Sequence, residues 1–282
     1  VYKRQVRALA FSPDGKFLAS GSTTVRVWSI ETGEQLKVFQ MDNPCTSVVL
    51  LPEGKILALS EKGTIKTWDV VTGQLLHEVQ AVGGQEFLTM SPNGKLVAGC
   101  IEGAAGVWDV ETGWLVAEFE SFKGYIIPCA AFSPKGDLVA FGGPGNLVSV
   151  WSVRTGEEVF TGGHAYGYAS AIAFSPDGTM ISSVAVDRSL KIWDLKQQGK
   201  IVQTWKEVSP QVLSFSPDGR FLAVGLELFE VRTGQRASIF ARGEEKPLLP
   251  SISSVAFSPD GRLLATGTDM GTIYIWDLSH SK

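Results

Sequence analysis

The chain has 282 residues, of which 44% are hydrophobic and 19% are charged, and its formal net charge is −4. This length and apolar fraction can bury a large core, and a single closed β domain of this size is ordinary. The small, well-mixed charge argues against nucleic acid as a partner. No run of 18 apolar residues is present, so the sequence predicts no membrane association.

A unit of roughly 40 residues repeats along the chain. Its most complete copy is GHAYGYASAIAFSPDGTMISSVAVDRSLKIWDL, residues 163–195. Alternating apolar runs separated by turn residues predict three short antiparallel strands in this copy. Pro176 sets φ for a type I turn, Asp177 caps it, and Gly178 takes the position that needs a positive φ. Equivalent glycines recur at intervals of 39 to 42 residues: Gly15, Gly54, Gly94, Gly136, Gly219 and Gly261.

Seven copies of the unit follow one another from end to end. The third strand of each copy closes on a large aromatic residue: Trp28, Trp68, Trp108, Trp151, Trp193, Phe229 and Trp276. A Thr-Gly turn follows most of these residues and leads into a fourth apolar run, such as 35–39 or 115–119. The sequence therefore predicts one all-β domain of seven four-stranded units, at residues 6–40, 41–80, 81–120, 121–161, 162–206, 207–240 and 241–282.

The Gly-His pair, the Asp of the second turn and the Trp-Asp pair resemble the WD40 repeat family, over all seven copies. The resemblance implies a seven-bladed β-propeller whose first strands line a central channel. It also implies a structural hydrogen-bonded tetrad in the fifth copy, in which Asp187 fixes His164 and Ser183 links that histidine to Trp193. A catalytic Ser-His-Asp triad is the less favoured alternative. The regular FSPDG and WDVETG segments look similar to bacterial members of the family.

The two ends of the chain bear on ring closure. The seventh copy ends just past its third strand, so we expect the fourth strand of this blade to be missing. The resemblance implies that a strand from the opposite terminus normally fills this place, which removes the free edges. Residues 1–5, VYKRQ, match the translation of a transposon-end adaptor used in sequencing libraries. We expect these residues to be non-native and the chain to be a fragment; the alternative is a genuine short terminus on a ring with a three-stranded last blade.

The copies differ mainly on one face. The resemblance places the Ser-Pro-Asp-Gly and Thr-Gly turns on the bottom, and the second turns and the connections between blades on the top. The second turn is cut by about five residues in the sixth copy, and the connection after it, including 241–251, is about six residues longer than the commonest one. This variation predicts that any binding site lies on the top face.

Candidate binding residues lead into the inner strands around the top of the channel or lie in the long connection: Pro44, Ile126, Tyr168, Ser209, Ser251, Leu248 and Leu249. Exposed aromatic residues on loops above a rigid scaffold favour a binding patch. The alternative is that nearby aromatic residues only fill the grooves between blades: Phe122, Tyr125 and Tyr166.

Enzyme chemistry has little support. The three histidines fall on different copies, and no paired-carboxylate, P-loop or G-x-S-x-G motif lies on a suitable element. We therefore expect no enzymatic activity, no cofactor and no metal. Three cysteines stand singly within strand patterns, which is typical of buried thiols in a reducing compartment and predicts the cytoplasm: Cys45, Cys100 and Cys129.

The predicted function is a non-catalytic scaffold that binds a protein or peptide through its top face and is itself a monomer. The alternative is a regulatory or sensor propeller from a larger protein, whose enzymatic domain, such as a protein kinase or a protease, lies N-terminal to this segment.

Overall fold

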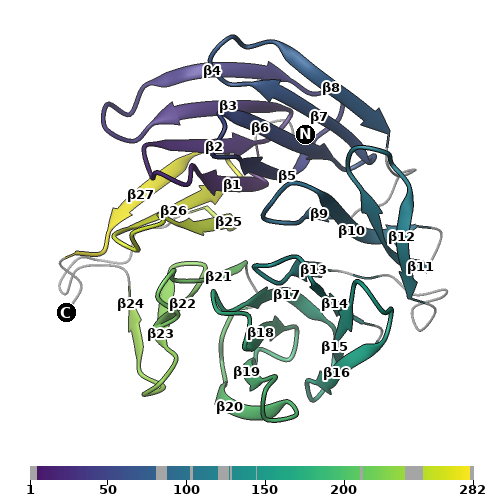
Figure 1. Ribbon diagram of the computed structural model, residues 1–282. Helices are drawn as coiled ribbons and strands as arrows, with labels where there is room; N and C mark the ends of the chain where they lie inside the picture. The colour runs from purple at the N-terminus through teal and green to yellow at the C-terminus, as the bar shows by residue number, and fades with distance from the viewer. Residues whose placement is uncertain are drawn as a thin grey trace.

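The computed structural model describes residues 5–80, 88–101, 104–119, 127, 129–143, 145–209, 212–238 and 250–279. Within these ranges, seven antiparallel sheets are arranged around a central axis (Figure 1). The strands of each sheet lie in sequence order, so each blade is a meander. The chain is a seven-bladed β-propeller, as the repeats predict. Across the described residues, no helix has the length and apolar character needed to span a membrane.

The first four blades have four strands each. Blade 1 contains β1 (Ala8–Phe11), β2 (Phe17–Gly21), β3 (Thr24–Ser29) and β4 (Gln35–Gln40). Blade 2 contains β5 (Cys45–Leu50), β6 (Lys55–Ser60), β7 (Thr64–Asp69) and β8 (Leu75–Gln80). Blade 3 contains β9 (Leu88–Met90), β10 (Leu96–Ile101), β11 (Ala104–Asp109) and β12 (Leu115–Phe119). Blade 4 contains β13 (Cys129–Phe132), β14 (Leu138–Gly142), β15 (Leu147–Ser152) and β16 (Glu158–Gly163), which continues into the range expected for the fifth unit.

The last three blades differ in size. Blade 5 contains β17 (Ala169–Phe174), β18 (Met180–Ala185), β19 (Leu190–Asp194) and β20 (Lys200–Trp205). Blade 6 contains β21 (Leu213–Phe215), β22 (Phe221–Val224), β23 (Glu227–Glu230) and β24 (Arg236–Ser238). Blade 7 contains β25 (Ile252–Phe257), β26 (Leu263–Thr268) and β27 (Ile273–Asp277), so the expectation of a three-stranded last blade is confirmed.

Local turn chemistry sets the ends of the first two strands in most blades. In blade 5, the Ser175 hydroxyl donates to the Asp177 carboxylate at 2.6 Å and accepts a hydrogen bond from the Met180 N–H at 2.9 Å. Gly178 has a φ of +70°, a conformation that favours glycine. The same hydroxyl-to-turn bond recurs in turns that begin at Ser12, Ser91, Ser216 and Ser258. These turns together form the bottom face.

The core lies between successive blades. A large residue of one blade's fourth strand packs on the closing aromatic residue of the next blade, with ring centroids 5.1 to 5.8 Å apart in four pairs: Phe39–Trp68, Phe119–Trp151, Phe160–Trp193 and Trp205–Phe229. Such pairs remove a large apolar area from water and add a favourable ring–ring contact. At these four junctions, the closing aromatic residue of one blade therefore depends on the outer strand of the preceding blade.

Blade 6 is the smallest blade. Its second and third strands are paired only as far as Val224 opposite Glu227, and a two-residue turn that begins at Gly225 joins them. β22 has four residues, whereas the equivalent β18 has six. The deletion that the sequence places in the second turn therefore also shortens the strands at the top of the blade.

The first and last blades meet close to the axis. The Val6 N–H donates to the Thr268 carbonyl at 3.0 Å, and the hydroxyls of Ser253 and Ser254 donate to the Val6 carbonyl at 2.6 and 2.9 Å. Figure 1 shows the yellow strands of blade 7 beside the purple strands of blade 1. On the outer side of blade 7, β27 has no further strand among the described residues.

Candidate functional site

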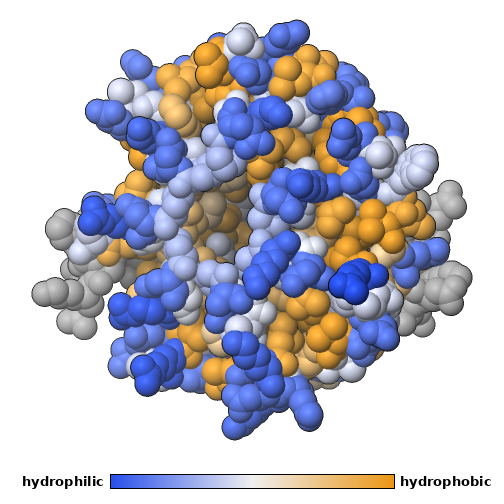
Figure 2. All heavy atoms as spheres, in the orientation of Figure 1, coloured by the Kyte–Doolittle hydropathy of each residue, from blue (hydrophilic) through white to orange (hydrophobic). Residues whose placement is uncertain are grey.

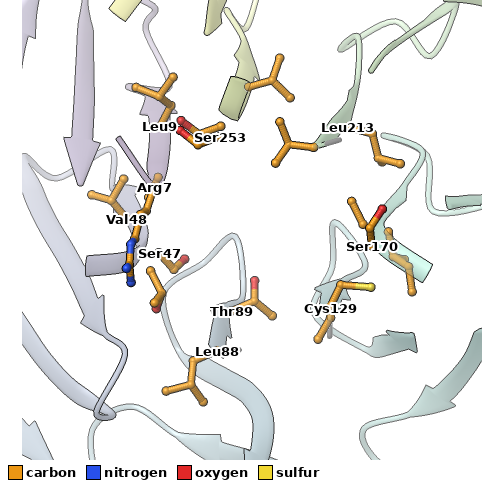
Figure 3. Close-up of a pocket in the computed structure, with 18 of the residues that line it drawn as sticks. Arg7, Leu9, Ser47, Val48, Leu88, Thr89, Cys129, Ser170, Leu213 and Ser253 are labelled. Carbon is orange, nitrogen blue, oxygen red and sulfur yellow. The ribbon is translucent and has the colours of Figure 1, made fainter. Parts of the chain in front are cut away.

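The first strands surround a central cavity of about 530 Å³. Figure 3 shows Arg7, Ser47, Thr89, Ser170 and Ser253 around this space, each from a different blade, and Figure 2 shows a hollow near the middle of the ring. The wall contains both hydroxyl groups and apolar side chains. The Arg7 guanidinium forms an ion pair with Glu61 at 2.6 Å. The charge of the wall is therefore largely neutralised at this point.

Three of the predicted top-face residues occupy equivalent places above their inner strands. The carbonyls of Pro44, Tyr168 and Ser251 each accept a hydrogen bond from an N–H of the second turn of the same blade, at 2.9, 3.1 and 3.0 Å. In blade 6 the corresponding bond runs from the Gly225 N–H to the Val212 carbonyl. Ser209 is exposed and precedes this position, because the shortened hairpin of blade 6 pairs lower on its inner strand.

The remaining predicted residues of the top face cannot be placed with these four. Ile126, Leu248 and Leu249 lie outside the described residues, as do Phe122 and Tyr125.

A small apolar patch stands on top of blade 5, and we call Tyr166, Tyr168 and Val186 the tyrosine patch. Their exposed fractions are 64%, 50% and 40%. Gly167, with a φ of +73°, turns the loop between the two tyrosines and passes so close to Val186 that a Cβ here would lie 3.0 Å from the valine Cβ. Tyr166 is thus exposed to solvent and does not fill a groove between blades.

A chain of hydrogen bonds lies directly beneath this patch. The Ser189 hydroxyl donates to the Asp187 carboxylate at 2.6 Å and lies 2.7 Å from His164 Nδ1. His164 Nε2 lies 2.6 Å from the Ser183 hydroxyl. Because a carboxylate can only accept, the Ser189 oxygen must accept the proton of Nδ1, and Nε2 accepts from Ser183. The network therefore holds His164 as one defined neutral tautomer.

The network differs from the expected tetrad in two respects. Ser189 stands between Asp187 and His164, whose direct separation is 3.4 Å. Among the described residues, no hydrogen bond joins Ser183 to the Trp193 indole; the rings of His164 and Trp193 instead meet edge to face at 5.8 Å. The sequence feature that could have identified Ser189 is its position two residues after Asp187. At this spacing its N–H donates to the carboxylate, at 2.8 Å.

The expected hydroxyl-to-indole link is present in other blades. The Trp28 indole donates to the Ser20 hydroxyl, and the Trp276 indole donates to the Thr266 hydroxyl, both at 2.9 Å. In blade 5, the Ser183 hydroxyl is instead engaged by the histidine.

The geometry of the network does not suit nucleophilic catalysis. Ser183, which contacts His164 Nε2, has an exposed fraction of 0%, and that of His164 is 3%. A substrate carbonyl could not reach this hydroxyl without opening the sheet. The Asp187 carboxylate instead accepts a hydrogen bond at 2.9 Å from the Ala165 N–H, in the loop that carries Tyr166 and Tyr168. The network is therefore built to hold that loop.

The two titratable groups of the network have shifted pKa values. Burial lowers the pKa of His164 below its ordinary value, although the nearby Asp187 opposes this shift. Burial alone would raise the pKa of Asp187, but hydrogen bonds from Ser189 and Ala165 outweigh it and leave the pKa of this carboxyl lowered. At neutral pH, the structure thus holds a neutral histidine beside an ionised aspartate.

The stability of the chain is expected to fall as the pH drops below about 6.5, the ordinary pKa of histidine. Because folding lowers the pKa of His164, the unfolded chain binds this proton first, and the loss accumulates until the folded pKa is reached. Denaturant unfolding at pH 7.5 and 5.5 measures it. His164→Gln cannot take up this proton and should show the smaller pH dependence; equal pH dependence of both proteins would contradict the assignment.

The cysteines offer no reactive thiolate in the described residues. Burial raises the pKa of the Cys45 and Cys129 thiols to about 12, so both are protonated at neutral pH. The side chain of Cys100 lies outside the described residues. The described part of the chain also contains no group of three or more His, Cys, Asp or Glu side chains that could hold a metal ion.

A comparison with protein-family models matches the chain to "WD domain, G-beta repeat" at residues 2–29, 156–194 and 248–277. The second match covers the whole hydrogen-bond network of blade 5, and the other two cover the blades that meet where the ring closes. These three segments match WD40 repeats. The bottom turns and the third-strand aromatic residues of these segments recur in blades outside the matched ranges as well.

Curated relatives resemble parts of this propeller. The guanine nucleotide-binding protein subunit beta of Oryza sativa subsp. japonica is 27% identical over 171 residues, 55% of this chain and 45% of the relative. The periodic tryptophan protein 2 homolog of Schizosaccharomyces pombe is 27% identical over 134 residues, 43% of this chain and 16% of the relative. The chain thus matches less than half the length of the first relative and about a sixth of the second. These relatives are eukaryotic, so the expectation of a bacterial source has no support from them.

Proposed function

We propose that this WD40 propeller is a non-catalytic interaction module that binds a protein or peptide segment through the tyrosine patch and the neighbouring top of the channel. The observation that carries the proposal is the exposure of Tyr166 and Tyr168 on a loop that the Asp187 carboxylate holds through the Ala165 N–H. Tyrosine side chains give a large contact area with few torsions to restrict, and a preformed loop lowers the entropic cost of binding.

The relatives support the general class of function. One of them is named as a subunit of a guanine nucleotide-binding protein, so it works within an assembly. The alternative, a sensor propeller attached to a protein kinase or protease domain, draws no support from these relatives. The interaction module is therefore the function that we propose.

Selection of a phage-displayed peptide library against the immobilised chain tests the proposed face. Selected peptides should lose at least about tenfold in affinity for the double variant Tyr166→Ser and Tyr168→Ser, because truncating a central aromatic contact typically removes about 2 kcal/mol. Both side chains are exposed, so the fold should survive.

A bottom-face variant provides the matched control. Val71 and Trp114 are 79% and 77% exposed on turns of blades 2 and 3, so Val71→Ser with Trp114→Ser removes a similar apolar area from the opposite face. Peptides that bind this control as tightly as the parent chain support the proposal. Peptides that lose affinity for the control and keep it for the tyrosine variant would overturn it.

A further inference from the structure

The second turn of blade 5 holds an arginine in a backbone conformation that favours glycine. Arg188 has a φ of +60°, and its N–H donates to the Ala185 carbonyl at 2.9 Å. Gly63 and Gly271 hold the same place in blades 2 and 7, five positions before the closing tryptophan, with φ values of +79° and +87° and the same turn hydrogen bond. A residue with a side chain is strained in this region. The turn of blade 5 therefore keeps Arg188 at a cost to stability.

The arginine side chain returns no contact for this strain within the described residues. Arg188 is exposed and forms no side-chain hydrogen bond or ion pair there. The neighbouring Asp187 carboxylate is 3% exposed and is engaged in the network with Ser189. Glu207 is exposed too, and the Val208 N–H beside it donates to the Arg188 carbonyl at 2.9 Å, yet no ion pair joins the two charged side chains. The guanidinium is thus available to an anion from outside the chain.

Arg188 borders the tyrosine patch. It follows Val186 by two residues in the same turn, so the two Cα atoms are at most about 7 Å apart. The Val186 N–H donates to the Tyr168 carbonyl at 3.1 Å, which ties this turn to the loop of the two tyrosines. The Arg188 backbone is itself held by its bonds to the Ala185 carbonyl and the Val208 N–H. A cation on a fixed backbone therefore stands beside the exposed aromatic surface of blade 5.

We propose that Arg188 selects a carboxylate, so that the partner segment carries an aspartate or glutamate beside the apolar residue that packs on the tyrosine patch. This inference rests on the proposed function and names the chemistry of the partner. An arginine binds a carboxylate through two parallel hydrogen bonds, which adds geometric specificity to the attraction of charge. The tyrosines supply contact area, and the arginine decides which partners fit. Glycine suits the turn better but has no group with which to discriminate between partners.

Selection of a random phage-displayed peptide library against two baits tests the choice of charge. Peptides selected on the parent chain should be enriched in aspartate and glutamate, and those selected on the Arg188→Glu chain should be enriched in lysine and arginine. A fluorescent copy of the most enriched acidic peptide, followed by anisotropy, should bind the Arg188→Gln chain about three- to tenfold more weakly than the parent chain. The same peptide with its acidic residue replaced by lysine should prefer the Arg188→Glu chain.

Two further variants separate recognition from folding and from general charge. Because glycine adopts a positive φ without strain, Arg188→Gly should melt about 2 °C higher than the parent chain and bind the acidic peptide as weakly as Arg188→Gln does. Arg154→Gln is the matched control, because Arg154 is exposed on the bottom turn after β15. It makes the same change of charge on the opposite face and should leave the affinity unchanged.

The outcomes distinguish this inference from the proposed function. Peptides that lose affinity for the Tyr166→Ser and Tyr168→Ser variant but bind Arg188→Gln as tightly as the parent chain would overturn the role of Arg188 and leave the proposed face in place. Peptides that ignore the tyrosine variant would overturn the proposed function. An Arg188→Gly chain that melts below the parent chain would assign the arginine to the fold. Equal losses in Arg154→Gln and Arg188→Gln would show a general effect of charge, and either of these last two results overturns the inference.

Discussion

Replacing Asp187 with alanine is expected to lower the free energy of unfolding by about 3 kcal/mol, because it removes the ionised acceptor of three hydrogen bonds. The carboxylate accepts from the Ser189 hydroxyl and N–H and from the Ala165 N–H, and its side chain is 3% exposed. Its loss leaves these donors without their partner and His164 without its fixed tautomer. Urea unfolding of the parent and variant measures the difference.

Two companion variants sharpen this experiment. Ser189→Ala should cost about 1 to 2 kcal/mol, because the relay to His164 is broken while the Ala165 bond survives. Asp194→Ala in the same blade removes an exposed cap and should cost clearly less than Asp187→Ala. Equal unfolding free energies for the Asp187 and Asp194 variants would show that the buried network does not contribute as drawn.

The Asp187 variant also links stability to function. Because the Ala165 bond holds the loop that carries Tyr166 and Tyr168, its loss should weaken peptides selected on the tyrosine patch. Ser189→Ala, which keeps that bond, should weaken them less. The two variants thus separate the support of the loop from the rest of the network.

Replacing Phe119 with alanine is expected to cost about 3 to 5 kcal/mol, the usual range for a buried phenylalanine that leaves a cavity. Phe119 ends the fourth strand of blade 3, is 1% exposed, and lies between Phe141 and Trp151 with ring centroids 5.5 and 5.3 Å apart. Without the phenyl ring, Trp151, the closing tryptophan of blade 4, loses a packing partner. Thermal and urea unfolding measure the loss.

Leu115→Ala is the matched control on the same strand. Leu115 is 50% exposed on β12, so its truncation should change the unfolding free energy by about 0.5 kcal/mol or less. If the two variants were equally stable, the packing of fourth strands on the next blade would not be the main source of stability at the blade junctions.

Much of the fold follows from short-range chemistry that a sequence displays directly. A turn such as Ser175 to Gly178 is closed by bonds among residues at most five apart, so each copy of its sequence predicts the same turn. Alternation between such turns predicts the strands, and seven copies predict the ring. The absence of a fourth strand in blade 7 among the described residues could be predicted for the same reason, because the repeat has a known number of strands.

The candidate sites depended on contacts between blades and on burial. Ser189 joins the network because pairing of β18 with β19 and the loop after β16 bring three segments together. Ser209 does not lie at the position of Pro44, Tyr168 and Ser251, because the short hairpin of blade 6 pairs with Val212 instead. Counting residues from the repeat does not reveal this shift.

The sequence by itself determined the number of blades, their strand order and the chemistry of the bottom turns, because each is encoded within one repeat. Only the tertiary structure decided which tyrosines are exposed, which hydroxyl connects Asp187 to His164, and that Arg26 and Trp28 border a cavity beside β27. The last of these joins residues almost the whole chain apart. Such contacts exist only after the ring brings its first and last blades together.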